Sequence, residues 1–179
     1  MLGVRVGAAL AAMVLGAGLV GAGSAMAQSA KPTDPQIAHI AYTAGDIDIK
    51  AAKLALEKSK NPQVRAFAED MVRDHTAVND QALALVKKLN VTPQDNDTSK
   101  SLVKQADAER TKLSALNGAA FDKAYAQNEV AYHKTVNGAL QNTLIPSASN
   151  PELKSLLETG LKMFQGHQQH AEMVAAALK

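Results

Sequence analysis

Apolar residues recur at three- and four-residue steps through most of this chain, and this spacing limits its fold more than any other feature. The clearest example surrounds the segment 69–79, where one continuous stripe is formed by Val64, Phe67, Ala68, Met71, Val72, Val78, Ala82, Leu85 and Leu89. A stripe of this period is the buried face of an amphipathic helix. The sequence contains no strand-like alternation, fixed-period repeat or glycine-rich phosphate loop, so it predicts an all-α protein.

Three Asx-Pro pairs mark where helices should begin, because Asp and Asn are favoured N-caps and proline is a favoured first helical residue. They are Asp34-Pro35, Asn61-Pro62 and Asn150-Pro151. Together with the apolar stripes and the turn signals, they predict four long helices over about 35–58, 62–90, 119–144 and 151–178. Pro146 is expected to stop the third of these, and a shorter helix is predicted over about 100–116.

The connections between these helices predict how they are arranged. The first two are joined by a very short turn, so they should be antiparallel neighbours. The connection from the second to the third is long and carries the short extra helix. Four long helices with one long crossover have the ferritin-like plan, so we expect a ferritin-like four-helix bundle over residues 35–179.

The first 27 residues have the features of a secretory signal peptide. Arg5 is the only charge, an uncharged run follows over 6–26, and Ala25-Met-Ala27 supplies a cleavage pattern. The run is long enough for a membrane anchor, but it is rich in Ala and Gly and ends in that pattern. We therefore expect export to the periplasm or cell envelope, a flexible tail over 28–34, and no transmembrane span in the mature protein.

Size and charge exclude several classes of protein. Removing 27 residues from 179 leaves 152, enough for one domain with its own core, and removing Arg5 lowers the net charge from +2 to +1. Nucleic-acid binding needs clustered Lys and Arg, so we expect no nucleic-acid partner. Cysteine is absent, so an exported protein of this kind must be stabilised by helix packing rather than by disulfides.

Each predicted long helix carries one ionisable residue on or near its apolar face. These residues are Asp48, His75, His133 and His167. Four-helix bundles build metal sites from side chains on facing helices in this way. Three imidazoles and one carboxylate suit Zn, Fe, Cu or Ni better than Ca or Mg, so a transition-metal site is one hypothesis for this set.

Three further residues can support such a site. Glu129 lies one turn before His133, where it can orient the imidazole or add an oxygen ligand. Asp74 lies at the edge of the second helix's stripe, and His170 lies on a face next to that of the last candidate histidine. His39 lies to one side of its helix and is expected at the surface.

Two other interpretations of the same residues stay open. The histidines can form a hydrogen-bonded polar core with Asp48, Asp74 or Asn79, or they can sense the external pH. A di-iron centre is not expected, because such bundles use Glu-x-x-His on two helices. The residues three positions before the four histidines of these helices are Val72, Val130, Phe164 and His167.

Several segments together resemble a bacterial family of exported, ferritin-like four-helix proteins, a domain-of-unknown-function family often given the provisional label of outer membrane protein. The segments are Asp48-Ile49, Phe67-Ala-x-x-Met71-Val-x-Asp74-His75, Phe121-Asp122-x-Ala-Tyr125 with His133, and His167-x-x-His170-Ala171. The resemblance covers about residues 35–178 and implies a fold and an envelope location, but no activity. The family usually has Glu in place of Asp48, and Gln or an apolar residue in place of Glu129.

The preferred hypothesis is a soluble bundle protein of the periplasm or envelope with a non-catalytic binding or stress-related role. A second hypothesis is a transition-metal-binding protein or metal-dependent enzyme that uses Asp48, His75, His133 and His167. A third is a helical interaction module that pairs with itself or with another envelope protein. Whether the protein is an enzyme is left open by the sequence.

Overall fold

The computed structural model describes residues 31–178 of the chain. The predicted signal peptide, 1–27, and the first part of the predicted tail lie outside the described residues, so the predicted domain division stays a prediction. Within 31–178 the structure contains helices and no strand, which confirms the all-α prediction. The elements are α1 (Asp34–Lys58), α2 (Pro62–Lys88), α3 (Asp97–Ser114), α4 (Gly118–Ala139), the π-helical turn η1 (Leu140–Leu144), α5 (Ile145–Ser147) and α6 (Pro151–Ala177).

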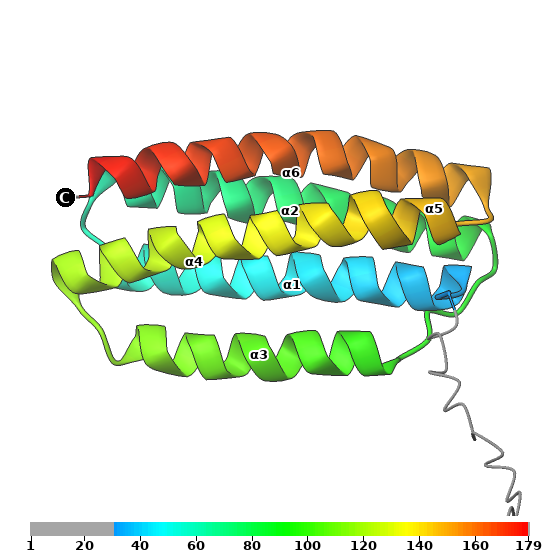
Figure 1. Cartoon of the computed structure of the whole chain (residues 1–179), viewed down its shortest axis with the longest axis horizontal. Helices are drawn as coiled ribbons and strands as arrows, with labels where there is room; N and C mark the ends of the chain where they lie inside the picture. Colours follow the sequence, from blue (N-terminus) through cyan, green and yellow to red (C-terminus); the bar gives the residue numbers. More distant parts are fainter. Residues whose placement is uncertain (1–30, 179) are drawn as a thin grey trace, which may run out of the picture. The chain divides into compact units, whose positions relative to one another are not determined.

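The four long helices α1, α2, α4 and α6 form the predicted bundle (Figure 1). Helix α1 packs against α2, α2 against α6, α6 against α4, and α4 against α1. Helix α3 belongs to the long crossover between α2 and α4, and it packs on the outside of α1 and α4. The prediction of a ferritin-like bundle with an extra helix in its crossover is therefore confirmed.

Two of the three predicted helix starts have the expected caps. The Asn61 side chain accepts hydrogen bonds from the backbone N–H groups of Gln63 and Val64 at the start of α2. Asn150 does the same at the start of α6, through Glu152 and Leu153. These bonds satisfy backbone donors that have no partner inside the helix.

The start of α1 differs from the prediction by one residue. Thr33, not Asp34, is the N-cap, and its backbone N–H donates to the Gln36 side chain. The Asp34 carboxylate instead accepts hydrogen bonds from the backbone of Ser149 and Asn150, each at 2.8 Å. Asp34 therefore ties the start of α1 to the turn before α6, a contact that no local sequence pattern predicts.

The end of the third long helix also differs from the prediction, since helical structure continues through Pro146 to Ser147. Proline lacks an N–H and cannot form the usual bond to the carbonyl four residues earlier. The π-helical turn over Leu140–Leu144 lies immediately before this point. Its wider i→i+5 hydrogen-bond pattern lets the helix continue although Pro146 cannot donate a backbone bond.

The apolar core of the bundle is divided into two clusters. One contains Phe67, Met71, Phe121, Tyr125 and Ala171, and the other contains Ile37, Ile40, Leu140, Leu157 and Phe164, each with further neighbours. Along each of the four long helices, the candidate site residue lies between positions that belong to the two clusters. A buried polar layer therefore separates the two apolar clusters. Every helix within residues 31–178 is too short or too polar to span a lipid bilayer.

Candidate metal centre

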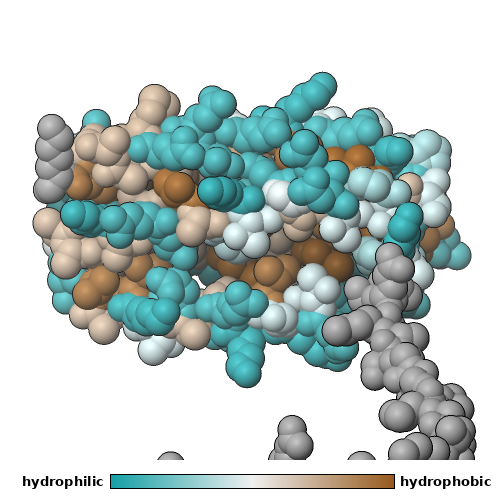
Figure 2. All heavy atoms as spheres, viewed as in Figure 1, coloured by the Kyte–Doolittle hydropathy of each residue, from teal (hydrophilic) through white to brown (hydrophobic). Residues whose placement is uncertain are grey.

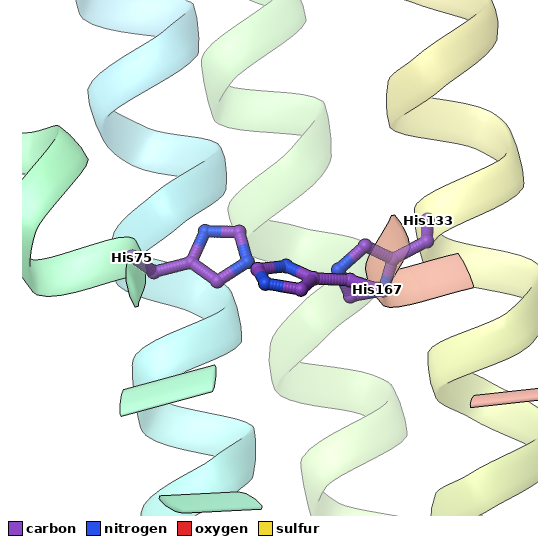
Figure 3. Close-up of side chains that lie close together, drawn as sticks. All are labelled: His75, His133 and His167. Carbon is purple, nitrogen blue, oxygen red and sulfur yellow. The ribbon is translucent and has the colours of Figure 1, made fainter. Parts of the chain in front are cut away.

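The structure brings together the four residues that the sequence singled out. Asp48, His75, His133 and His167 come from α1, α2, α4 and α6, and all four are buried. The three imidazoles point toward one another (Figure 3), and each offers a nitrogen within 4.8 Å of those of the other two. Asp48, Glu129 and His133 form a second such group, which shares His133 with the first. The polar side chains of four separate helices therefore meet at one depth.

Asp48 connects the two groups. Its Oδ2 atom lies 3.3 Å from Nε2 of His75 and 3.4 Å from Nε2 of His133. These are ion-pair distances, but neither contact has hydrogen-bond geometry, and both carboxylate oxygens lack a hydrogen-bond partner among the described residues. A fully buried carboxylate thus faces two imidazole nitrogens without being satisfied by them.

The orientation of His133 is set by the backbone of its own helix. Its Nδ1 lies 3.0 Å from the main-chain oxygen of Glu129, one turn earlier. A carbonyl oxygen can only accept, so Nδ1 carries the hydrogen. The lone pair is then on Nε2, the atom that faces Asp48. Holding one imidazole nitrogen with a backbone carbonyl is a common way to orient a metal-binding histidine.

His167 is oriented by a carboxylate. Its Nε2 lies 3.0 Å from Oδ2 of Asp74, and the Arg73 guanidinium holds that carboxylate with contacts of 2.8 and 3.1 Å. The ionised Asp74 accepts, so Nε2 carries the hydrogen and the lone pair is on Nδ1. That atom is buried and has no hydrogen-bond partner within residues 31–178. The carboxylate–histidine pair is an arrangement often found behind metal ligands.

His75 is held by packing rather than by hydrogen bonds. Its ring stacks on Phe164, with centroids 4.6 Å apart, and lies 5.7 and 5.3 Å from the rings of His133 and His167. Both of its nitrogens are buried without a hydrogen-bond partner in the described part of the chain. Because a buried polar atom left in this way costs about 1–3 kcal/mol, such atoms are rare in native proteins. Several such atoms gather at this one point of the bundle.

Burial keeps the imidazoles neutral and the carboxylates protonated. It lowers the pKa of His75 to about 3, helped by the neighbouring histidines, and lowers the pKa of His133 to about 4. It also lowers the pKa of His167, against the opposing effect of the Asp74 carboxylate. Burial raises the pKa of Asp48 to about 8 and the pKa of Glu129 well above its usual range. Neutral imidazole is the form that binds metal ions.

The other two histidines lie elsewhere. The His170 ring packs edge-on against Phe67, and its Nδ1 is 3.9 Å from Asp70, so it does not join the other three imidazoles. His39 was expected at the surface, but it is half-buried and lines a cavity beside α3. The predicted supporting role of Asp74 has a geometric basis, whereas that of His170 has none.

Sequence reasoning gave Glu129 only a supporting place, and it assigned no role at the centre to Arg73 or Phe164. The Glu129 carboxylate is fully buried, and its Oε2 lies 3.6 Å from Nδ1 of His133. Its spacing of four residues from His133 was the signal that the two side chains share a face. Arg73 contacts Asp74, and Phe164 stacks on His75, so each affects the centre only through another side chain. The positions of these two residues in the sequence gave no signal of that role.

Comparisons with known proteins agree with the fold. The sequence profile of a domain of unknown function, DUF4142, matches residues 20–174. No curated protein matches the chain. A secreted DUF305 protein from Streptomyces coelicolor is 13% identical, with a TM-score of 0.68 over 80% of this chain and 91% of its own. CopM in its Cu(II)-bound form is 16% identical, with a TM-score of 0.61 over 82% and 98%. At these identities the two structures show a shared fold alone.

Proposed function

The chain belongs to the DUF4142 family of domains of unknown function, and because that description assigns no activity, we propose one from the buried centre. The protein binds a single divalent transition-metal ion between its four long helices. The proposed ligands are Asp48 Oδ2, His75 Nε2, His133 Nε2 and His167 Nδ1. The observation that carries the proposal is that the four side chains belong to two groups of possible ligands, which share His133, and that the proposed donor atoms are buried and lack hydrogen-bond partners within residues 31–178.

The two printed contacts of Asp48 with the imidazoles have the spacing expected for one shared ion. Two donors bound at about 2.1 Å to a tetrahedral ion lie about 3.4 Å apart. Asp48 Oδ2 lies 3.3 Å from His75 Nε2 and 3.4 Å from His133 Nε2. A hydrogen-bonded polar core would need these atoms to bond to one another with good geometry. They are close enough to do so but misaligned, which favours the metal over the polar core.

The charge of the centre supports a divalent cation. When a metal displaces the protons, Asp48 and Glu129 carry two negative charges and the three imidazoles stay neutral. A divalent ion balances these charges, so that no net charge stays buried. The donor set of three nitrogens and one oxygen suits Zn(II), Cu(II), Ni(II) and Fe(II), among which Cu(II) binds most strongly in general. The name of CopM, a Cu(II)-bound protein of the same fold, adds a reason to include copper in the test.

The proposed role is binding rather than catalysis. Four protein ligands close a tetrahedral site, whereas catalytic metal sites keep a position open. A metal-dependent enzyme is the alternative if the ion takes a further ligand. The resemblance of the first residues to a signal peptide and the shared fold with a secreted protein support action in the periplasm or envelope.

Metal analysis of untagged protein tests the proposal. The protein is stripped with chelator, reloaded with Zn(II) or Cu(II), desalted and analysed for bound metal. We expect about one equivalent and a higher melting temperature, because a ligand that binds only the native state stabilises it. The variants His75→Ala, His133→Ala and His167→Ala should each lose the ion, while His39→Ala keeps it. Less than about a tenth of an equivalent on the folded wild-type protein would remove the proposal.

A further inference from the structure

A cavity of about 270 Å³ lies between α3 and the groove formed by α1 and α4. In Figure 2, hydrophobic atoms lie along a hollow between α3 and the helices above it. The lining runs from exposed residues, such as Lys50 and Asp107, to the fully buried Asp48 and Glu129. The cavity therefore connects the protein surface with the carboxylate side of the buried centre.

The inner wall of the cavity carries polar atoms that hydrogen bonds do not satisfy. Asp48 and Glu129 are each only 1% exposed, yet both line the cavity. Both oxygens of Asp48 and the Oε2 atom of Glu129 lack hydrogen-bond partners within residues 31–178. Buried carboxylate oxygens of this kind, on residues that line a cavity, are suited to receive a cation that arrives through it.

The charge of the lining also favours a cation. Its outer lining carries three ionised carboxylates, Asp46, Asp107 and Glu109, and two cationic side chains, Lys50 and Arg110, while the protonated Asp48 and Glu129 lie at its inner wall. Near the outside, Lys50 pairs with Asp46 at 2.7 Å and Arg110 pairs with Asp107 at 2.9 Å. The excess of negative charge in a cleft with low-dielectric walls concentrates cations there.

The other edge of the centre is less suited to a cation. His167 is 7% exposed and lies beside Asp74, which is half-buried between α2 and α6. The Arg73 guanidinium covers that carboxylate and also binds Asp70 at 2.7 Å. Because Arg73 already pairs with both Asp70 and Asp74, these carboxylates are less available to an arriving cation than carboxylates without such a partner.

Helix α3 covers the cavity and is held mainly near its ends. Within α3 only Ser99 and Leu113 are buried, one near each end. Between them, Leu102, Val103 and Ala106 lie over the cavity, and Val103 is 43% exposed. The middle of α3 thus has little buried contact with the bundle, so moving it outward costs less than moving any of the four long helices.

From this arrangement we infer that the cavity beneath α3 is the route by which a divalent transition-metal ion reaches the buried centre. Asp48 and Glu129 are the first protein ligands that the ion meets, and the middle of α3 is the cover. The inference rests on the proposed metal-binding function, but it concerns the path of the ion rather than its final site.

Stopped-flow loading of metal-free protein with Zn(II), followed by competition with a zinc-sensitive dye, tests the route. Ala106→Phe fills the cavity from α3, and Ala131→Phe fills it from α4. Each should slow loading about tenfold or more while leaving the final stoichiometry at one ion and the affinity nearly unchanged. Ala108→Phe is the matched control, because it makes the same change on an exposed α3 residue outside the cavity lining, and it should load at the wild-type rate.

The outcomes separate the route from the function. If the wild-type protein binds no Zn(II), the metal-binding proposal itself is wrong. If it binds Zn(II), and both cavity variants fold and load at the wild-type rate, the route is wrong and the site stands. If neither variant folds, the salt dependence of wild-type loading decides. Entry through an acidic cavity requires the rate to fall as ionic strength rises, and a rate that rises or stays constant overturns the route.

Discussion

At the scale of single residues, the centre consists of imidazoles whose orientations have identifiable causes. The backbone oxygen of Glu129 holds His133, and the Asp74 carboxylate holds His167. In both cases the hydrogen-bonded nitrogen carries the hydrogen, so the lone pair of the ring is on its other nitrogen. His75 has no such partner among the described residues and is positioned by its stacking on Phe164. The three histidines therefore differ in how substitution should affect them.

Asp74→Asn tests the importance of orientation without removing a ligand. An amide is a weaker acceptor than a carboxylate and no longer anchors Arg73 as an ion pair, so His167 becomes less basic and less well oriented. We expect metal affinity to fall about 10–100-fold, with the one-ion stoichiometry retained. Isothermal titration calorimetry measures this, with Asp80→Asn, an exposed change on the same helix, as the control. Equal affinities for the two variants would show that Asp74 plays no part.

His75→Leu separates binding from stability. Leucine fills a similar volume and has no polar atoms, so the substitution removes two buried nitrogens that lack hydrogen-bond partners in the described structure. We expect the free energy of unfolding of the metal-free protein to rise by about 1 kcal/mol, while metal binding is lost. Urea unfolding in the presence of a chelator measures the change. A fall of similar size would mean that His75 gains hydrogen bonds that stabilise the metal-free state.

At the scale of helices, local signals predicted most of the boundaries. Asn61 and Asn150 cap helices as expected, and Asn90, with a φ of 53°, adopts the left-handed conformation just beyond the end of α2. The predictions differed from the structure where a distant contact decides the outcome, as where Asp34 bonds to the turn before α6. Such contacts depend on which helix ends meet in the folded bundle, and no local pattern contains that information.

Gly45→Ala tests how closely α1 and α2 approach beside the centre. A Cβ atom at this position would collide with the Asn79 side chain, whose amide donates to the Tyr42 carbonyl at 3.3 Å. Relieving the collision means breaking that bond or separating the helices, so we expect stability to fall by about 1–3 kcal/mol. Gly166→Ala is the control, because a Cβ there meets nothing within 4 Å and should add about 0.5–1 kcal/mol. Chemical denaturation of both variants measures the difference, and an equal gain in both would contradict the close approach.

At the scale of the whole molecule, the result that the sequence could not establish is the common depth of the polar residues. Periodicity indicates the face of a helix on which a residue lies, but not how far the helix is shifted along its axis. In the structure, Asp48, His75, His133 and His167 form one layer between two apolar clusters. The candidate ligands were thus predictable one by one, whereas their convergence and the cavity that reaches Glu129 depend on how five helices pack.

This layer should give the metal-free protein a stability maximum near pH 6.5. Asp48 and Glu129 have raised pKa values, so above that pH the native state holds protons that the unfolded chain has lost, and stability falls as the pH rises toward about 8. The three histidines of the layer have lowered pKa values. Below their usual value of 6.5 the unfolded chain takes up protons on three histidines that the native state protonates less readily, which works against the effect of the two retained carboxylate protons, and stability falls again.

Urea unfolding between about pH 4.5 and 8.5, with chelator present, measures this profile. Each proton that is bound in only one of the two states, native or unfolded, changes the free energy of unfolding by about 1.4 kcal/mol per pH unit. Saturating Zn(II) should abolish the fall above pH 6.5, because the metal-bound native state holds none of these protons. Asp48→Asn should weaken the same limb in the metal-free protein by removing one of its two titrating groups. Stability that rises steadily to pH 8 without metal would contradict this prediction, because it would mean that the two carboxylates are ionised in the native state. Ionised carboxylates at this depth would require cationic partners, and the buried layer contains none within residues 31–178.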